Sequence, residues 1–217
     1  MMKRLIDITL SLMAVILFLP FGLIIALILR FTGEGEIFYL QPRVGKDGRI
    51  FNLIKFATML KDSPNIGTGD ITVKHDPRVL PFGGFLRKTK LNEVPQVLNI
   101  LKGDMSIVGP RPQTPKYFAY FPESLQPTIK SMRPGLTGVG SIVFRDEESI
   151  IAKLGGDPIE AHKNKIAPYK AELEGWYKQN RSLILDLKLI WFTALVVLRP
   201  GDISKKNLLK DLPPASF

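Results

Sequence analysis

The chain has 217 residues, of which 45% are hydrophobic and 23% charged, a composition that excludes a disordered tail and a multi-span transporter. Its 30 Lys and Arg outnumber its 20 Asp and Glu, and the net charge of +10 favours a polyanionic partner such as nucleic acid, anionic lipid or a phosphorylated substrate. The chain has no cysteine, which excludes disulfides, thiol nucleophiles and common zinc clusters, and its 2 histidines argue against a His-rich metal site.

The amino-terminal segment is apolar enough to enter a membrane. Residues 8–29 carry no charge, and their number is close to the ~20 that a membrane helix needs. A cleaved signal peptide is disfavoured because the apolar core is too long. Pro20 lies near the middle and predicts a kink or break. Two alternatives stay open, a re-entrant hairpin in one leaflet and a span. The basic residues at both ends favour the hairpin, with both ends in the cytoplasm.

The following residues predict a small β-hairpin and a loop. Residues 36–41 and 49–56 read as strands, and the Gly-Lys-Asp-Gly sequence at residues 45–48 supplies the turn. Residues 62–76 are polar and Gly-rich, which is typical of a loop. Residues 80–90 combine apolar and basic side chains, so they form either a surface helix at the bilayer boundary or a half-buried core helix.

Residues 92–101 give the clearest helix signal. Asn92 is a good N-cap, Pro95 suits the first turn, and Gly103 predicts the end. The pattern predicts further helices at residues 116–120, 123–132, 159–180 and 182–198. The expected fold class is therefore α+β, mostly helical with one β-hairpin, in a monotopic membrane protein. Residues 1–31 would be inserted in the membrane, and residues 32–217 would form a cytoplasmic, membrane-associated catalytic domain.

Several segments carry the residue types that phosphate binding requires. Arg78 and Arg87 precede the helix at residue 92, and Glu93 lies in its first turn. Arg111 stands between two prolines in a Gly-containing loop, residues 103–112, and residues 133–138 repeat these residue types. Taken singly, each residue also has a structural explanation: a helix cap, a favourable first-turn acid or a surface ion pair. Residues 146–148 predict a solvated helix start.

Taken together, these segments resemble the bacterial sugar transferase family, the monotopic phosphoglycosyl transferases that start membrane glycan assembly. The resemblance covers roughly residues 2–200. It rests on Lys3, Arg4, Asp7, Pro20, residues 41–45, Lys55, Phe56, residues 76–78, residues 85–89, Glu93, Pro95, Gln96, residues 103–112 and residues 133–138.

The resemblance implies transfer of a phosphosugar from a UDP-sugar to polyprenol (undecaprenyl) phosphate, with Mg²⁺ required. It places the protein at the cytoplasmic face of the bacterial inner membrane, in contact with its lipid, with a homodimer as an option and no nucleic-acid partner. Glu93 and Asn92 would be catalytic, Glu93 would also bind the metal, and Pro20 would be the membrane break. The implied substrate-binding residues are Lys55, Arg78, Arg87, Arg111, Arg133, Thr137 and Arg145.

The sequence departs from the family pattern at the reactive pair. Asn92 stands where the family has the nucleophilic Asp, and Ala57 stands where it usually has Arg. A carboxamide is a poor nucleophile and a weaker Mg²⁺ ligand than a carboxylate. Three hypotheses follow: Glu93 takes over as nucleophile or metal ligand, the protein is an impaired homologue that serves as a substrate-binding partner or scaffold, or transfer is direct without a covalent intermediate. A membrane-tethered nucleic-acid binder is a further alternative, but the usual recognition motifs are missing.

Overall fold

The computed structural model describes residues 2–67, 72, 75–198 and 212–215. The chain divides into two compact units, the first from residues 1–41 and 52–103, and the second from residues 42–51 and 104–217. The β-hairpin carries the chain from the first unit to the second and back. The amino-terminal helix is part of the first unit, and the predicted functional boundary between residues 31 and 32 stays a prediction.

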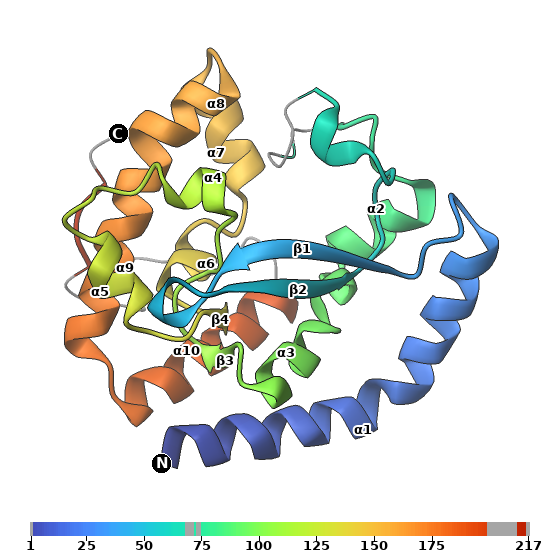
Figure 1. Cartoon of the computed structure of the whole chain (residues 1–217), viewed down its shortest axis with the longest axis horizontal. Helices are drawn as coiled ribbons and strands as arrows, with labels where there is room; N and C mark the ends of the chain where they lie inside the picture. Colours follow the sequence, from blue (N-terminus) through green and yellow to red (C-terminus); the bar gives the residue numbers. More distant parts are fainter. Residues whose placement is uncertain (1, 68–71, 73–74, 199–211, 216–217) are drawn as a thin grey trace. The chain divides into compact units, whose positions relative to one another are not determined.

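The predicted fold class is confirmed, because the described residues are mostly helical with a small β-hairpin (Figure 1). The first unit and the hairpin contain α1 (Met2–Phe31), β1 (Phe38–Val44), η1 (Lys46–Gly48), β2 (Ile50–Phe56), η2 (Ser63–Asn65), α2 (Pro81–Lys88), η3 (Leu91–Glu93) and α3 (Gln96–Lys102). The second unit contains β3 (Ser106–Val108), α4 (Pro115–Phe118), α5 (Gln126–Lys130), β4 (Gly135–Thr137), α6 (Val139–Val143), α7 (Glu147–Leu154), α8 (Pro158–Ala161), η4 (His162–Ile166), α9 (Ala167–Asn180) and α10 (Leu183–Leu198).

Helix α1 is one continuous helix that changes direction along its length (Figure 1). Pro20 lies inside it, and proline bends helices because it lacks an N–H donor and its ring presses on the preceding turn. The change of direction agrees with the proline inside the helix, and the helix does not end at Pro20. By length and composition α1 could cross a membrane, and most of its large apolar side chains are exposed. It is a candidate membrane anchor.

Both ends of α1 are held by other parts of the first unit. At the beginning, Arg4 donates to the Ile100 and Leu101 carbonyl oxygens, at 2.6 and 3.0 Å, in the last turn of α3. At the end, Leu29 is buried in one apolar cluster with Phe56 and Leu86. A guanidinium at a helix C-terminus binds free carbonyl groups and complements the helix dipole. The exposed middle of α1 is thus bounded by two attached ends.

Helix α3 starts later than its sequence pattern predicts. It begins at Gln96, and Asn92 lies inside the preceding 3-10 turn η3 instead of capping the helix. The reason is Lys90, whose φ of 62° turns the chain sharply after α2, so that Glu93 N–H reaches the Lys90 carbonyl at 3.1 Å. The predicted end is confirmed, because Gly103 takes the left-handed conformation with φ 97°.

Buried Asn99 fastens α3 to β2. Its Nδ2 donates to the Asn52 carbonyl at 2.8 Å, and its Oδ1 accepts the Ile54 N–H at 3.0 Å. The Asn99 carboxamide thus pairs with one backbone carbonyl and one backbone N–H of β2 that a neighbouring strand would otherwise bind. The strand edge is satisfied, and the turn before α3 is fixed relative to β2.

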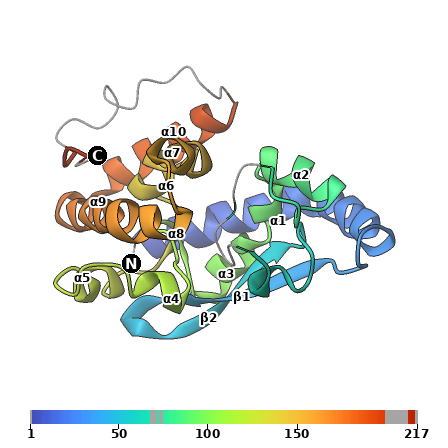
Figure 2. The ribbon, with the colours of Figure 1, turned by 90° about the horizontal axis from the view of Figure 1, so that it is seen from above.

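The second unit is arranged around α9. Figure 2 shows α9 between α5 on one side and α6 and α10 on the other, and Ala167 and Ala171 share an apolar cluster with Phe118, Phe121 and Ile129. The single helix predicted at residues 159–180 is in fact α8, a π-helical turn and α9 in succession. Pro168 has no N–H for the preceding turn, which accounts for the irregular ladder before it.

Candidate functional site

The first unit groups the elements that carry four of the sequence-predicted site residues. Phe56, Leu86 and Leu91 belong to or pack against one apolar cluster. Each is the direct neighbour in sequence of a predicted residue, respectively Lys55 on β2, Arg87 on α2, and Asn92 followed by Glu93 on η3. A shared core therefore positions the backbone of all four.

Asn92 and Glu93 occupy the tight turn between α2 and α3. Asn92 is buried, with 6% of its surface exposed, and Glu93 is half-buried. The Asn92 Oδ1 atom has no hydrogen-bond partner among the residues that the structure describes. A buried oxygen without a partner costs about 1–3 kcal/mol in desolvation. This acceptor is thus suited to a donor group or a cation supplied by a ligand.

The two predicted arginines of this unit differ in their partners. Arg78 is buried and pairs with Asp76 at 2.6 Å, and its Nη1 also donates to the Ser63 and Ile66 carbonyls at 2.8 Å. These bonds tie Arg78 to the Asp76 carboxylate and to the backbone at Ser63 and Ile66. Arg87 is half-buried and donates to Thr72 Oγ1 at 2.7 Å, in the segment between Ile66 and Asp76.

The residues present fit a Mg²⁺ ion of the kind that substrate phosphates help to hold. Within the described ranges there is no group of three or more His, Cys, Asp or Glu side chains suited to a metal. Mg²⁺ in phosphate-transfer sites is commonly bound by one or two carboxylates together with phosphate oxygens and water. The Glu93 carboxylate and the buried Asn92 Oδ1, on consecutive residues, are oxygen donors of the type that such an ion binds.

The second unit brings together the two Gly-containing segments that the sequence singled out. Strand β3 from the first segment pairs in parallel with β4 from the second, in the register Ser106 to Gly135 and Val108 to Thr137. A Cβ at Gly109 would lie 2.3 Å from the Arg133 carbonyl oxygen, so only glycine fits there. The sequence did not reveal these strands because each has only three residues.

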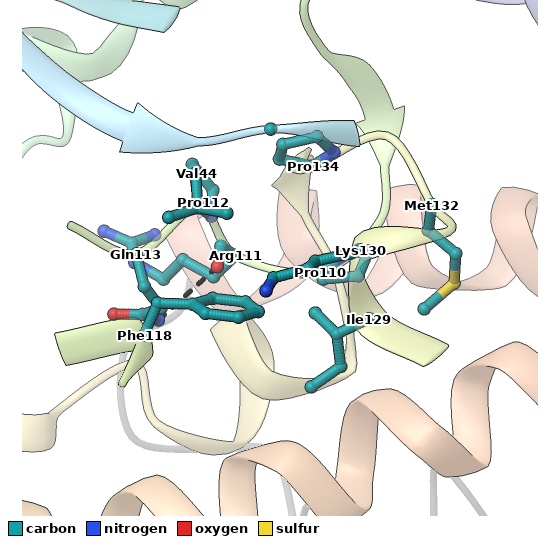
Figure 3. A pocket seen from close by; sticks show the side chains of 11 residues that line it. Val44, Pro110, Arg111, Pro112, Gln113, Phe118, Ile129, Lys130, Met132 and Pro134 are labelled. Carbon is teal, nitrogen blue, oxygen red and sulfur yellow. Dashed lines mark hydrogen bonds between the residues drawn. The ribbon is translucent and has the colours of Figure 1, made fainter. Parts of the chain in front are cut away.

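Arg111 follows β3 and lines a shallow pocket (Figure 3). Its carbonyl accepts a hydrogen bond from Gln113 at 3.4 Å, and the Lys130 ammonium lies 5.1 Å from the centre of the Phe118 ring. The pocket lining also contains Val44, Gly45, Pro110, Pro112, Ile129, Met132 and Pro134. It therefore combines two cations with an apolar wall.

The three other predicted residues of this unit have different surroundings. Arg133 is exposed. Thr137 is buried, and its hydroxyl lies 2.6 Å from the Thr193 hydroxyl of α10, so it joins β4 to that helix. Arg145 is half-buried, burial lowers its pKa, and its Nη1 has no partner in the described part of the chain. Of these three, Arg145 has a donor left for a ligand.

A largely buried charged cluster interacts electrostatically with Arg111, and no sequence pattern indicated most of its members. Lys170 Nζ is 2.7 Å from Glu147 Oε2, and His162 Nε2 is 3.4 Å from Glu147 Oε1. Asp146 does begin α7, as predicted, by accepting the Ser149 N–H at 3.4 Å. The predicted solvation of this helix start is only partial at Glu147, whose side chain is 28% exposed and pairs with Lys170 and His162.

The electrostatics of the cluster follow from burial and from Lys170. Burial acts to raise the pKa of Glu147, but Lys170, His162 and Arg111 outweigh it and lower that pKa. Burial, with Lys170 next, lowers the pKa of His162 to about 4, so its ring is neutral at pH 7. Burial raises the pKa of Glu174 to about 8, so this carboxyl is mainly protonated at neutral pH.

Comparison with known proteins gives consistent relatives. The exopolysaccharide production protein ExoY of Sinorhizobium fredii is 31% identical over 209 residues, covering 90% of this chain and 84% of that protein. The UDP-N-acetylgalactosamine-undecaprenyl-phosphate N-acetylgalactosaminephosphotransferase of Aeromonas hydrophila is 32% identical over 198 residues, 90% of this chain and 43% of that protein. The undecaprenyl-phosphate galactose phosphotransferase of Salmonella typhimurium is 31% identical over 213 residues, 91% of this chain and 40% of that protein.

The chain thus spans most of one of these relatives and less than half the length of the other two. The family model described as "Bacterial sugar transferase" matches residues 1–200. That range includes α1, the turn with Asn92 and Glu93, and the paired strands beside Arg111. The chain therefore belongs to the bacterial sugar transferase family, whose members are associated with membranes.

Proposed function

We propose that this protein transfers a phosphosugar from a UDP-sugar to polyprenol phosphate at the cytoplasmic face of the bacterial inner membrane. The observation that carries the proposal is the turn η3, where half-buried Glu93 directly follows Asn92 in sequence and the buried Asn92 Oδ1 has no hydrogen-bond partner among the described residues. Two relatives are named as phosphotransferases that act with undecaprenyl phosphate, and one of these names includes a UDP-linked sugar.

The proposed chemistry assigns the reactive role to Glu93. One carboxylate oxygen attacks the β-phosphorus of the donor, the bond from that phosphorus to the bridging oxygen breaks, and UMP leaves with the bonding electrons. An oxygen of polyprenol phosphate then attacks the same phosphorus and releases the carboxylate. The products are UMP and a polyprenol-diphosphate sugar.

Cationic side chains are the candidates for neutralising the diphosphate in this scheme. Arg87, in the same unit as Glu93, and Arg111, in the second unit, are proposed as donor-binding residues because a guanidinium is the group best matched to phosphate oxygens. A Mg²⁺ ion held by Glu93, Asn92 Oδ1 and the donor phosphates would supply further charge neutralisation. Lys55, Arg133 and Arg145 are additional candidates for contact with the donor.

The membrane topology in this proposal is re-entrant. A helix of 30 residues is about 45 Å long if straight, which would suffice to cross a bilayer. Arg4 near its beginning and Leu29 near its end are nevertheless both attached to elements of the first unit. A soluble unit that holds both ends of a helix keeps both on its own side of the membrane, which supports the hairpin prediction.

A second candidate function follows from Asn92. The side chain at this position is neutral, and a carboxamide does not form an acyl phosphate. In this alternative the protein binds donor and lipid and acts as a partner or scaffold in the same pathway, with little turnover of its own.

A UMP-release assay with a panel of UDP-sugars and polyprenol phosphate separates the two functions. We expect release by the unmodified chain and a loss of at least about 100-fold in Glu93→Gln, because the nucleophile is removed. Glu36→Gln, which changes an exposed acid of the same unit, is the matched control. Activity that appears only in Asn92→Asp would establish the impaired homologue, and absence of UMP in every variant would refute the proposed transfer.

A further inference from the structure

Glu174 is a buried acid that the proposed chemistry does not use. It lies on α9 with 3% of its surface exposed. Removing an ionisable group from water is costly unless its surroundings compensate, so a buried acid needs a structural reason. The nearby ammonium of Lys170 is already paired with Glu147 at 2.7 Å, so Glu174 is not its main counter-ion.

Backbone hydrogen bonds from Arg111 and Gly140 act on the pKa of the Glu174 carboxyl, while its Oε2 atom has no hydrogen-bond partner among the described residues. The approach at Gly140 is close, because a Cβ built there would lie 2.5 Å from Glu174 Oε1. The two N–H groups belong to the two segments that β3 and β4 join. One side chain thus fastens both segments to α9.

The hydrogen bond from the Arg111 N–H matters because this part of the loop has few backbone donors. Pro110 and Pro112 flank Arg111, and proline has no backbone N–H. Arg111 therefore carries the one backbone donor of the Pro-Arg-Pro triplet, and Glu174 accepts from it. The triplet's carbonyls are held as well, with Gly135 N–H donating to Pro110 at 2.8 Å and Arg43 donating to Pro112 at 3.0 Å.

We propose that Glu174 is a positioning residue for Arg111: by accepting the Arg111 and Gly140 N–H groups it fixes the loop from which the guanidinium reaches the donor diphosphate. This inference rests on the role of Arg111 in the proposed function. Arg111 touches the substrate in this scheme, and Glu174 acts only through it.

The protonation state of Glu174 tells which variant preserves this role. Because burial raises its pKa to about 8, the group is a neutral carboxyl at pH 7, and glutamine keeps the same carbonyl acceptor without a charge. Lys170 and Tyr177 are the titratable side chains that interact electrostatically with Glu174, and Arg111 interacts with it through its backbone. Above pH 8 the ionised carboxylate adds a buried negative charge to the unit that holds Arg111, which disfavours binding of the anionic donor.

The test compares Glu174→Gln and Glu174→Leu in the full-length protein, with Glu172→Leu at an exposed position of the same helix as the matched control. The first readout is UMP release against UDP-sugar concentration. We expect Glu174→Gln to retain the donor KM at pH 7 within about twofold, and Glu174→Leu to raise it by about tenfold with a smaller change in kcat, because leucine offers no acceptor to the Arg111 and Gly140 N–H groups. In the Arg111→Ala background, Glu174→Leu should add no further loss.

The pH profile supplies a readout that a purely structural role would not move. The donor KM of the unmodified protein should rise between pH 7 and 9, and Glu174→Gln should remove most of that rise. Additive losses in the Arg111→Ala, Glu174→Leu double variant, or an unchanged alkaline rise in Glu174→Gln, would overturn the proposal.

Backbone hydrogen exchange tests the contact without any catalysis. Peptides covering residues 109–114 and 138–143 should exchange faster in Glu174→Leu and remain protected in Glu174→Gln and Glu172→Leu. This result would stand even if no UDP-sugar were turned over, so a failure of the proposed function is separable from a failure of this inference. Unchanged exchange at residues 109–114 in Glu174→Leu would refute it.

Discussion

His162 shows how a single side chain can tie the stability of the second unit to pH. It is buried against Tyr117, with 5.0 Å between ring centres, and its Nε2 faces Glu147. Burial and the charge of Lys170 lower its pKa to about 4, although Glu147 opposes this change. The folded protein therefore favours the neutral ring.

We predict that His162 makes the second unit acid-sensitive. Because its folded-state pKa is below the ordinary 6.5, its contribution is complete above pH 6.5 and is lost as the pH falls toward 4, by at most roughly 3 kcal/mol. In urea unfolding at pH 7.5 and 5, His162→Gln should reduce the difference in unfolding free energy. His75→Gln, which changes an exposed histidine, should leave it as it is. An equal difference in unfolding free energy between pH 7.5 and pH 5 in all three proteins would contradict this expectation.

Arg78 shows that residue type and position in the sequence are not enough to assign a role to a side chain. Its position before the central helix suggested a phosphate contact, but its donors are engaged with Asp76, Ser63 and Ile66. Arg111, from a similar sequence context, lines a pocket. The difference lies in burial and in the partners that the fold supplies, neither of which a local pattern contains.

At the scale of elements, the backbone of α2 packs closely against the segment that follows β2. Two adjacent glycines in α2 have opposite surroundings. A Cβ at Gly83 would lie 2.2 Å from the Thr58 carbonyl oxygen, whereas a Cβ at Gly84 would find its nearest atom, Val79 Cγ1, at 3.9 Å. One glycine is needed for contact between backbones, and the other is not.

We predict opposite effects of alanine at these two positions. Gly83→Ala should lower the free energy of unfolding of the first unit by about 2–4 kcal/mol, because the backbones must separate. Gly84→Ala should raise it by up to about 1 kcal/mol, since alanine loses less backbone entropy in a helix. Each variant serves as the other's control in thermal or urea unfolding, and a similar loss in both would show that the close contact is absent.

The helix boundaries show where sequence patterns were sufficient. Gly103 ended α3 as predicted, since a glycine with positive φ is a local signal. The predicted start of α3 was wrong, because Lys90 adopts the left-handed conformation, which its residue type does not indicate. Strands β3 and β4 were missed, because a three-residue strand gains its stability from a partner distant in sequence.

At the scale of the whole molecule, α1 decides the topology. The chain has no cysteine, so single cysteines can report on each end of the helix. Met2 and Phe31 are both exposed, at 64% and 80%, and are suitable positions.

We predict that Met2→Cys and Phe31→Cys react with a membrane-impermeant maleimide from the same side of the membrane. Both should be labelled in inverted inner-membrane vesicles and neither in intact spheroplasts, because Arg4 and Leu29 attach both ends to one unit. The unmodified chain is the control for background labelling. Labelling of Met2→Cys alone in intact spheroplasts would show that α1 crosses the bilayer.

The amino-acid sequence by itself determined the apolar anchor with its proline, the mostly helical class and the family, because hydropathy, backbone chemistry and contiguous motifs are local properties. Only the tertiary structure decided that α1 is attached at both ends, that Arg78 pairs with buried Asp76, and that the buried Glu174 carboxyl lies against the backbone of Gly140. These facts depend on burial and on hydrogen bonds between residues far apart in the chain. Such contacts set the free energy of a charge or an unpaired oxygen, and no short stretch of sequence records them.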